Sequence, residues 1–419
     1  MAIFVLAAYL GRRSPAAAGA LTLASLPLYL LRLQVLGLPT TLLEAAVLGG
    51  VCGYFSKALL HLTKINFRSF FRHPYFPPIL LISTASISAI FAAPNTIAAL
   101  GVWRAYFLEP LISLPFIYLA LKNPLYRSIV FKILAIETII IALIALFQKI
   151  DILPIVEPWS AEHRATGVYP YPNALGLFVA PLIPLFAAIA LFGKKEQIFF
   201  RITLAVAAAA GFIGIIFSQT EAAIGAVLIS LTILGLAALG TIRANMTRVA
   251  IVAIVAIAVV IFVSLARGTL WEKLTFQDWS GTVRRVMWRE TVAMLKTRPL
   301  LGAGLSGYPA AIAPFHADKK VEIFQYPHNE FLNVWSELGV LGVIGFLWLI
   351  ASFIFNLRLR STNEHRHLRI AAGLAMLALL IHGLVDVPYF KNDLAFLFWL
   401  VAILPFAARP QNLDSVKPP

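Results

Sequence analysis

The residues best suited to acid–base chemistry lie in the segment Tyr326-Pro327-His328-Asn329-Glu330, directly before a long apolar run. Asn329 is a suitable N-cap for a helix that begins there, because its side chain can accept a hydrogen bond from a free backbone N–H. His328 would then stand at a helix N-terminus, where the dipole disfavours imidazolium. A neutral imidazole can accept a proton from a hydroxyl, as a general base must. The same spacing also suits a histidine that only satisfies loop carbonyls.

A second group of residues could bind an anion. Five arginines share the stretch before this histidine: Arg267, Arg284, Arg285, Arg289 and Arg298. Guanidinium groups bind phosphate through paired hydrogen bonds. Arg284 and Trp288 are four residues apart, so they share one face of the amphipathic helix that residues 283–296 predict. The arginines fit a phosphate-bearing ligand, and contact with anionic lipid headgroups is the alternative.

Residues 163–173 read HRATGVYPYPN and precede another apolar run. Within them, Arg164 could reach a phosphate and Tyr171 could stack on a sugar. Asn173 stands where the apolar run begins. Prolines on both sides of Tyr171 also explain the segment as a rigid turn.

Three more polar residues lie at the ends of apolar runs. Glu221 is in a very short turn, and a carboxylate so close to lipid needs a partner or a role. His382 and Asp386 are four residues apart, a spacing at which the two side chains can pair on a helix. Simple pairing is the interpretation that the spacing favours.

Several other kinds of site are excluded. No His, Cys or carboxylate cluster has the spacing of metal ligands, and no cofactor is expected. Residues 302–307 match GxGxxG but follow a predicted helix and Pro299 rather than a strand, so they indicate turns and not a dinucleotide site. The single cysteine, Cys52, cannot form an internal disulfide.

The elements that position these residues must be membrane helices. The 419 residues are 60% hydrophobic and only 13% charged, and the mean hydropathy is +0.86. Soluble domains are nearer one quarter charged. Lipid offers the backbone no hydrogen-bond partners, so each apolar run of about twenty residues predicts a helix. The predicted fold is a single all-α integral membrane domain over residues 1–419.

Twelve spans are predicted, with Met1–Leu10 at the interface or beginning the first helix: residues 16–36, 40–60, 76–93, 99–121, 127–148, 174–192, 198–217, 221–240, 248–266, 331–356, 368–385 and 393–408. Basic residues follow every even-numbered span. The positive-inside rule therefore places both termini in the cytoplasm, and it explains the net charge of +15 without nucleic acid. The long connections 149–173 and 267–330 then face outward, and 267–330 forms an extracytoplasmic insert that carries much of the candidate site.

In an ordered set of segments the chain resembles the O-antigen ligase and polymerase superfamily of bacterial membrane glycosyltransferases. The segments are Arg164–Asn173, Gly281–Trp288, Arg298–Gly304 and His328–Leu332, followed by Glu337-Leu-Gly339 and Gly342. The twelve-span layout with a large outer loop before His328 agrees with the family. One departure is Ser218-Gln-Thr-Glu221, where the family often has Ser-x-Ser-Arg, so an arginine expected to contact diphosphate is absent.

The resemblance implies a GT-C-like bundle in the bacterial inner membrane that needs no metal. It implies transfer of a glycan from an undecaprenyl-diphosphate carrier to a hydroxyl on lipid A core, another glycan or a protein. In this interpretation His328 is the base, and Arg284 binds the diphosphate together with Arg267 or Arg164. The residues that would support the site or face the acceptor are Tyr171, Asn173, Glu221, Trp288, Asn329, Glu330, His382 and Asp386.

The sequence leaves ligase, polymerase and protein oligosaccharyltransferase open. The competing class is a twelve-span transporter or a flippase for lipid-linked glycans. Transporters often bind substrate near the bilayer midplane between related halves. Here the polar residues gather at one predicted face and the halves look unrelated, which favours the transferase.

Overall fold

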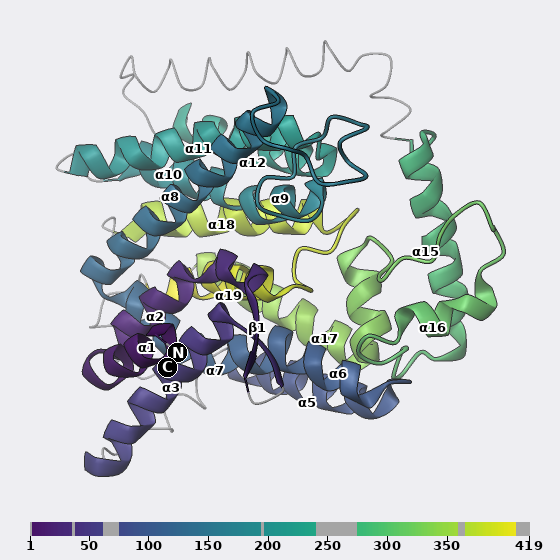
Figure 1. Cartoon of the computed structure of the whole chain (residues 1–419), viewed down its shortest axis with the longest axis horizontal. Coiled ribbons are helices and arrows are strands. Elements are labelled where there is room, and N and C mark those ends of the chain that lie inside the picture. The colour runs from purple at the N-terminus through teal and green to yellow at the C-terminus, as the bar shows by residue number, and fades with distance from the viewer. Residues whose placement is uncertain are drawn as a thin grey trace.

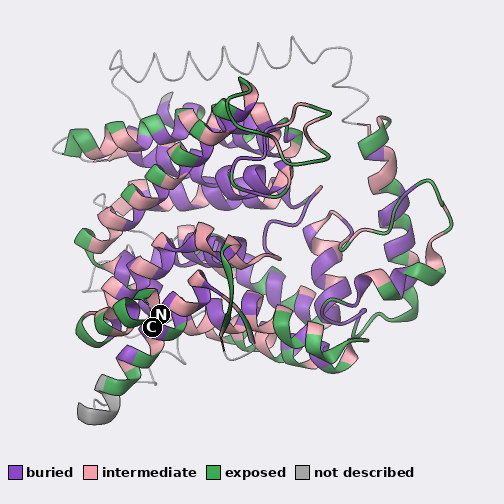
Figure 2. Ribbon diagram, in the orientation of Figure 1, coloured by how far each residue is buried: buried purple, intermediate pink, exposed green. Residues whose placement is uncertain are grey.

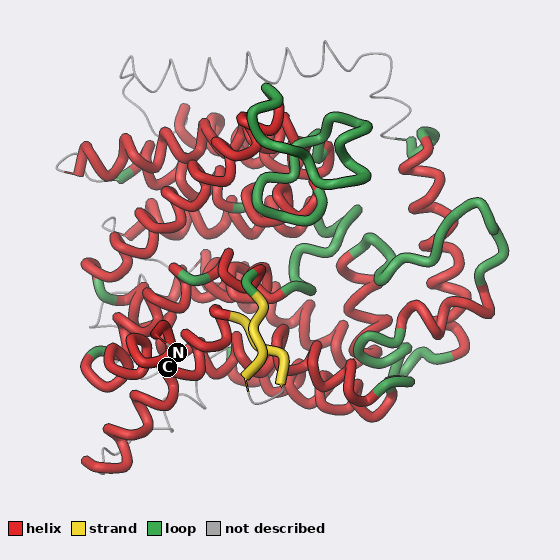
Figure 3. Tube along the Cα trace, in the orientation of Figure 1, coloured by secondary structure: helices red, strands yellow, loops and turns green. Residues whose placement is uncertain are grey.

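The computed structural model describes six ranges of the chain: residues 2–35, 38–61, 75–193, 197–239, 275–358 and 365–407. Within them the protein is helical apart from loops and one antiparallel hairpin, which confirms the predicted all-α class. Most helices run side by side, and the long loops gather with α15 (Trp279–Thr297) and α16 (Tyr308–Ile312) at one end of the bundle (Figures 1 and 3).

The N-terminal region is less regular than its hydropathy indicates. Helices α1 (Ala2–Arg13) and α2 (Pro15–Ala24) are followed by the 3-10 helix η1 (Leu26–Leu30). Strands β1 (Arg32–Val35) and β2 (Leu38–Thr41) then pair antiparallel before α3 (Leu42–His61).

The predicted span 16–36 is therefore wrong as one continuous helix. Pro27 has no N–H and its ring would clash with a helical carbonyl four residues earlier, which disfavours a regular helix through this position. Close packing of α1 on α3 completes this region. A Cβ atom on Gly53 would lie 1.9 Å from the Ala8 carbonyl oxygen, so only glycine allows this close approach of the two helices.

The central helices agree closely with the predicted spans. They are α5 (Phe76–Ala92), α6 (Thr96–Trp103), α7 (Glu109–Lys122), α8 (Pro124–Lys149), α9 (Pro172–Val179), α10 (Leu182–Phe192), α11 (Ile198–Ser218) and α12 (Glu221–Leu239). A π-helical segment, η2 (Arg104–Leu108), joins α6 to α7. The helix interrupted near Pro181 forms α9 and α10, which occupy one predicted span.

The C-terminal part contains α15, α16, the 3-10 helix η4 (Ala313–Phe315), α17 (Glu330–Arg358), α18 (Arg366–His382) and α19 (Asn392–Ala407). The amphipathic helix predicted from residues 283–296 is confirmed as α15, with Val286, Met287 and Met294 buried. Every residue of α19 from Asp393 onward is buried, which places this helix inside the bundle (Figure 2).

Six described helices are long and apolar enough to cross a membrane: Thr96–Lys122, Pro124–Lys149, Pro172–Phe192, Ile198–Ser218, Glu221–Ala238 and Glu330–Arg358. These helices support a chain that crosses the membrane more than once. The count of twelve remains a prediction, and the ninth predicted span, 248–266, lies outside the described residues.

The turn after α15 packs tightly through glycines. Gly302 and Gly304 have φ values of +66° and +77°, which favour glycine. A Cβ atom on Gly302 would lie 2.4 Å from the Ser336 carbonyl oxygen on α17. The GxGxxG-like stretch is therefore a close-packed turn against α17. This contact fixes the position of α15 relative to the first turns of α17.

Candidate active site

The start of α17 places His328 at the loop-rich end of the bundle. The Asn329 side chain accepts a hydrogen bond from the Leu332 N–H at 3.0 Å, which confirms the predicted N-cap. The same side chain donates to the Leu384 carbonyl at 2.8 Å, so it also joins α17 to the loop after α18. His328 itself has a φ of +47°, an uncommon backbone conformation that turns its side chain toward that loop.

His328 pairs with Asp386. The distance from His328 Nδ1 to Asp386 Oδ1 is 3.2 Å, and the two side chains are 18% and 2% exposed. Tyr326 and Phe324 border the imidazole edge-on, with ring centroids 4.9 and 5.2 Å away. A histidine held by a carboxylate on one nitrogen keeps its other nitrogen available for proton transfer.

Asp386 also joins the pair to the segment before α9. Asn173 donates from Nδ2 to Asp386 Oδ2 at 3.2 Å, and its Oδ1 accepts from Arg164 Nη2 at 3.0 Å. The hydrogen bonds thus form a continuous chain from Arg164 through Asn173 and Asp386 to His328. Four residues predicted from three separate segments meet here.

The charge state of Asp386 follows from these contacts. Burial by itself raises the pKa of the carboxyl. The hydrogen bond and charge of His328, the charge of His382 and the Val387 N–H outweigh burial and lower the pKa to about 2. Asp386 is therefore a carboxylate at physiological pH and can orient His328 as a hydrogen-bond acceptor.

Arg164 and Arg284 differ in how many of their guanidinium nitrogens form hydrogen bonds within the protein. Arg164 uses all three guanidinium nitrogens within the protein, on the Ser218 carbonyl, Glu162 and Asn173. Arg284 donates from Nε to the Val385 carbonyl at 3.0 Å and from Nη1 to Ser280 at 2.6 Å. Its Nη2 makes no hydrogen bond to any residue that the structure describes, so Arg284 retains donors next to Asp386.

Trp288 of α15 contacts the segment that carries His328. Its indole N–H donates to the Pro327 carbonyl at 2.9 Å, and its ring packs edge-on against Phe276. Because Pro327 precedes His328, α15 fixes the backbone of the histidine through this one hydrogen bond.

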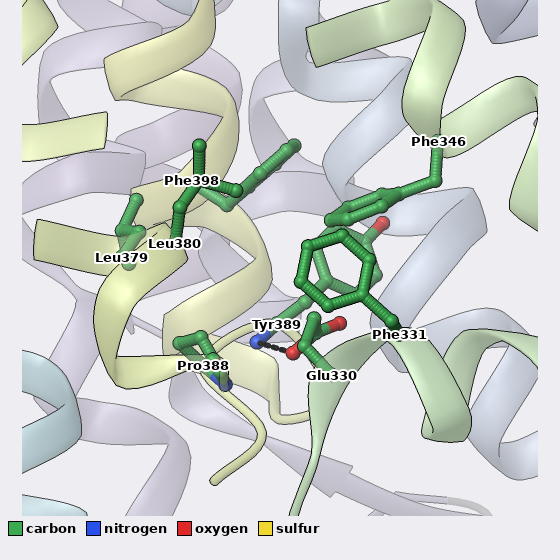
Figure 4. Close-up of a pocket in the computed structure, with 9 residues that line it drawn as sticks. Glu330, Phe331, Phe346, Leu379, Leu380, Pro388, Tyr389 and Phe398 are labelled. Carbon is green, nitrogen blue, oxygen red and sulfur yellow. Dashed lines mark hydrogen bonds between the residues drawn. The ribbon is translucent and has the colours of Figure 1, made fainter. Parts of the chain in front are cut away.

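Glu330 joins α17 to the loop between α18 and α19. Its backbone N–H donates to the Gly383 carbonyl at 2.7 Å, and its Oε2 accepts from the Tyr389 N–H at 3.1 Å. Oε1 is buried and has no partner among the described residues. Glu330 borders a small apolar cavity (Figure 4), whose other lining residues include Phe331, Phe346, Leu379, Leu380, Pro388 and Phe398.

Three more predicted site residues are Glu221, His382 and Arg267. Glu221 is exposed at the start of α12. His382 is buried, and its Nε2 has no partner within the described ranges. No hydrogen bond joins the side chains of His382 and Asp386 in the part of the chain that the structure describes. Helix α18 ends at His382, the Asp386 N–H donates to the His382 carbonyl at 3.0 Å, and the Asp386 carboxylate contacts His328. Arg267 lies outside the described residues.

The residues that the sequence did not single out are aromatic or lie in the loop before α19. Tyr389 bridges Glu330 and the Tyr106 carbonyl, to which its hydroxyl donates at 2.8 Å. Lys391 is surrounded by tyrosines. The only sequence signal was a polar cluster, Tyr389 to Asp393, between two apolar helices. Among the described residues, no group of three or more His, Cys, Asp or Glu could hold a metal ion.

The fold and this cluster define the class as a multi-pass helical membrane protein with a His–Asp pair and an arginine at one end. Residues 204–347 match the family model described as O-Antigen ligase. The match confirms the resemblance to the O-antigen ligase superfamily and indicates a membrane glycosyltransferase-like enzyme. It covers Arg284 and His328. A comparison with curated proteins found no match.

Proposed function

We propose that the protein transfers a glycan from an undecaprenyl-diphosphate carrier to an acceptor hydroxyl at the outer face of the bacterial cytoplasmic membrane, as an O-antigen ligase does. The observation that carries the proposal is the His328–Asp386 pair, with Arg284 holding the adjacent Val385 carbonyl. This arrangement supplies a base and a cation side by side, and the family match provides the reaction class.

The first step of the proposed reaction is proton removal. With Nδ1 donating to the Asp386 carboxylate, His328 carries its lone pair on Nε2. Nε2 accepts the proton of the acceptor hydroxyl while the hydroxyl oxygen forms a bond to the anomeric carbon of the glycan. Asp386 remains ionised and stabilises the imidazolium that forms.

The second requirement is stabilisation of the leaving group. The bond between the anomeric carbon and the diphosphate oxygen breaks, and the diphosphate leaves with the electron pair. Arg284 can donate from Nη2 to this oxygen or to its neighbours as negative charge develops. Arg164 is engaged through each of its nitrogens, so we assign it to orienting Asn173 and through it Asp386.

His328→Ala is the direct test. Loss of a general base typically lowers the rate about 100- to 10,000-fold, and we expect that loss while the amount of protein in the membrane stays normal. The measurement is glycan transfer by the purified protein from a lipid-linked donor. Near-normal transfer by the variant would remove His328 from the mechanism.

The surface glycans of a strain that lacks the protein distinguish among the three possible acceptors. Loss of attachment together with accumulated lipid-linked polymer indicates a ligase. Attachment of single units indicates that the protein is a polymerase. Normal lipopolysaccharide with unglycosylated protein indicates that the acceptor is a protein.

A further inference from the structure

The ammonium group of Lys391 lies among three tyrosine rings. Lys391 directly precedes α19, and its Nζ is 5.3 Å from the ring centroid of Tyr29, 4.8 Å from that of Tyr169 and 5.1 Å from that of Tyr171. Tyr29 belongs to η1, whereas the other two tyrosines lie in the segment before α9. One side chain therefore connects three parts of the chain that are distant in sequence. We call this group the lysine cage.

Three tyrosine rings and the charges of Asp393 and Asp386 stabilise this ammonium. Nζ is buried and has no hydrogen-bond partner among the residues that the structure describes. Burial lowers the pKa of Lys391, and the charges of Asp393 and Asp386 oppose that effect. A buried cation without hydrogen bonds is costly, so the faces of the tyrosine rings must hold their positions around it.

The lysine cage is connected to His328 through two hydroxyl groups. Tyr171, one wall of the cage, is hydrogen-bonded through its hydroxyl to Tyr326. Burial raises the pKa of both hydroxyls, so both stay protonated and can donate. Tyr326 then packs edge-on against the His328 imidazole at 4.9 Å. The contacts run from Lys391 through Tyr171 and Tyr326 to the imidazole.

We propose that Lys391 is a positioning residue for glycan transfer: its charge fixes Tyr171, and Tyr171 and Tyr326 fix the ring plane of His328. The inference rests on the proposed function. Asp386 restrains one nitrogen of the imidazole, but the ring can still rotate about that hydrogen bond. Tyr326 restrains this rotation, and a small misplacement of a catalytic group lowers the rate strongly.

The first test replaces Lys391 with methionine, which has a similar length and no charge. We expect Lys391→Met to lower kcat roughly tenfold, because His328 is misaligned. The KM for the lipid-linked donor should change by less than about twofold, because Lys391 touches no substrate. Lys319→Met is the matched control, since Lys319 is exposed and donates to the His316 carbonyl three residues away. A normal kcat for Lys391→Met would overturn the proposal.

The second test asks whether the effect passes through Tyr326. Tyr326→Phe removes the hydroxyl and keeps the ring, so it should lower kcat by itself. In that background Lys391→Met should lower kcat by less than about twofold more, because the connection is already broken. Independent, multiplicative effects of the two changes would contradict the inference.

A third variant covers the case in which Lys391→Met does not fold. Tyr171→Phe keeps the ring that faces Lys391 and removes only the hydroxyl that Tyr326 contacts. It should reproduce the kcat of Tyr326→Phe, and normal activity would overturn the inference. Failure of the proposed function is distinguishable, because His328→Ala would then be active. If His328→Ala is inactive while Lys391→Met and Tyr171→Phe are both normal, only the role of the lysine cage is refuted.

Discussion

In the proposed mechanism His328 depends on Asp386 in two ways, for the direction of its ring and for which nitrogen holds the proton. The 3.2 Å contact is formed by a carboxylate that is almost completely buried, and Asn173 occupies its other oxygen. Both carboxylate oxygens are therefore engaged within the protein. The proposed role of His328 as a base therefore depends more on Asp386 and Asn173 than on the position of His328 before a helix.

Asp386→Asn tests this dependence at constant size. The amide can donate to Nδ1 and then stabilise the tautomer that has no lone pair on Nε2, so we expect kcat to fall roughly 100- to 10,000-fold. The measurement is transfer by the purified variant. Asp151→Asn is the matched control, because it disrupts another His–Asp contact, the exposed pair of Asp151 with His163 at 3.1 Å. Equal loss in both variants would contradict a specific role for Asp386.

The same carboxylate predicts a pH dependence of stability. The pKa of Asp386 is lowered from 3.8 to about 2 in the folded protein, so its stabilising contribution is complete above the ordinary pKa and is lost as the pH falls through the folded-state value. The difference in melting temperature between the parent and Asp386→Asn should be constant from pH 7 to about pH 5. It should shrink between about pH 4 and pH 2. Shrinkage near pH 6 would show that another group is responsible.

Helix α15 directs its arginines toward different surroundings. Arg284 and Trp288 lie one helical turn apart, and both reach loops of the candidate site, at Val385 and Pro327 respectively. Arg285 instead donates to Thr282 of its own helix and is exposed. Arg284 and Arg285 are neighbours in the sequence, but they lie on different faces of α15, and of the two only Arg284 is seen to contact the candidate site.

Arg284→Lys tests this helix-face argument. Lysine offers a single point charge in place of the planar fork that matches phosphate oxygens. If Arg284 tightens on the leaving diphosphate, lysine should lower kcat more than it raises KM for the donor. Arg285→Lys and Arg289→Lys should behave nearly as the parent in the same purified assay. A functional Arg284→Lys beside an inactive Arg285→Lys would show that the wrong arginine was chosen.

Local patterns predicted the elements well, and long-range pairing explains what they missed. Periodicity predicted α15, and the Asn329 cap followed from residue type. The helical spacing of His382 and Asp386 predicted a side-chain pair, but α18 ends at His382 and the Asp386 side chain contacts His328. Asp386 pairs instead with a residue 58 positions earlier, and no local rule reports such a contact. The tyrosine partners of Lys391 were missed for the same reason.

At the scale of the whole molecule, the described polar contacts of the candidate site lie at one end of the helical bundle, where the long loops gather (Figure 3). A bundle of apolar helices must satisfy its backbone internally within lipid, so irregular segments such as 299–307 and 383–391 belong at the membrane boundary or inside protein. The prediction that remains to be tested is which side of the membrane this end faces.

The positive-inside rule predicts that the site faces away from the cytoplasm. Reporter fusions after residues 70, 197 and 362 should behave as cytoplasmic, since basic residues surround each position. Fusions near 160 and 310 should behave as exported, because each lies in a long connection after an odd-numbered span. An exported signal at 362 would contradict both the span count and the placement of His328. It would also exclude a lipid-linked donor presented at the outer face, because α17 would then carry its N-terminal end, and the His328–Asp386 pair beside it, into the cytoplasm.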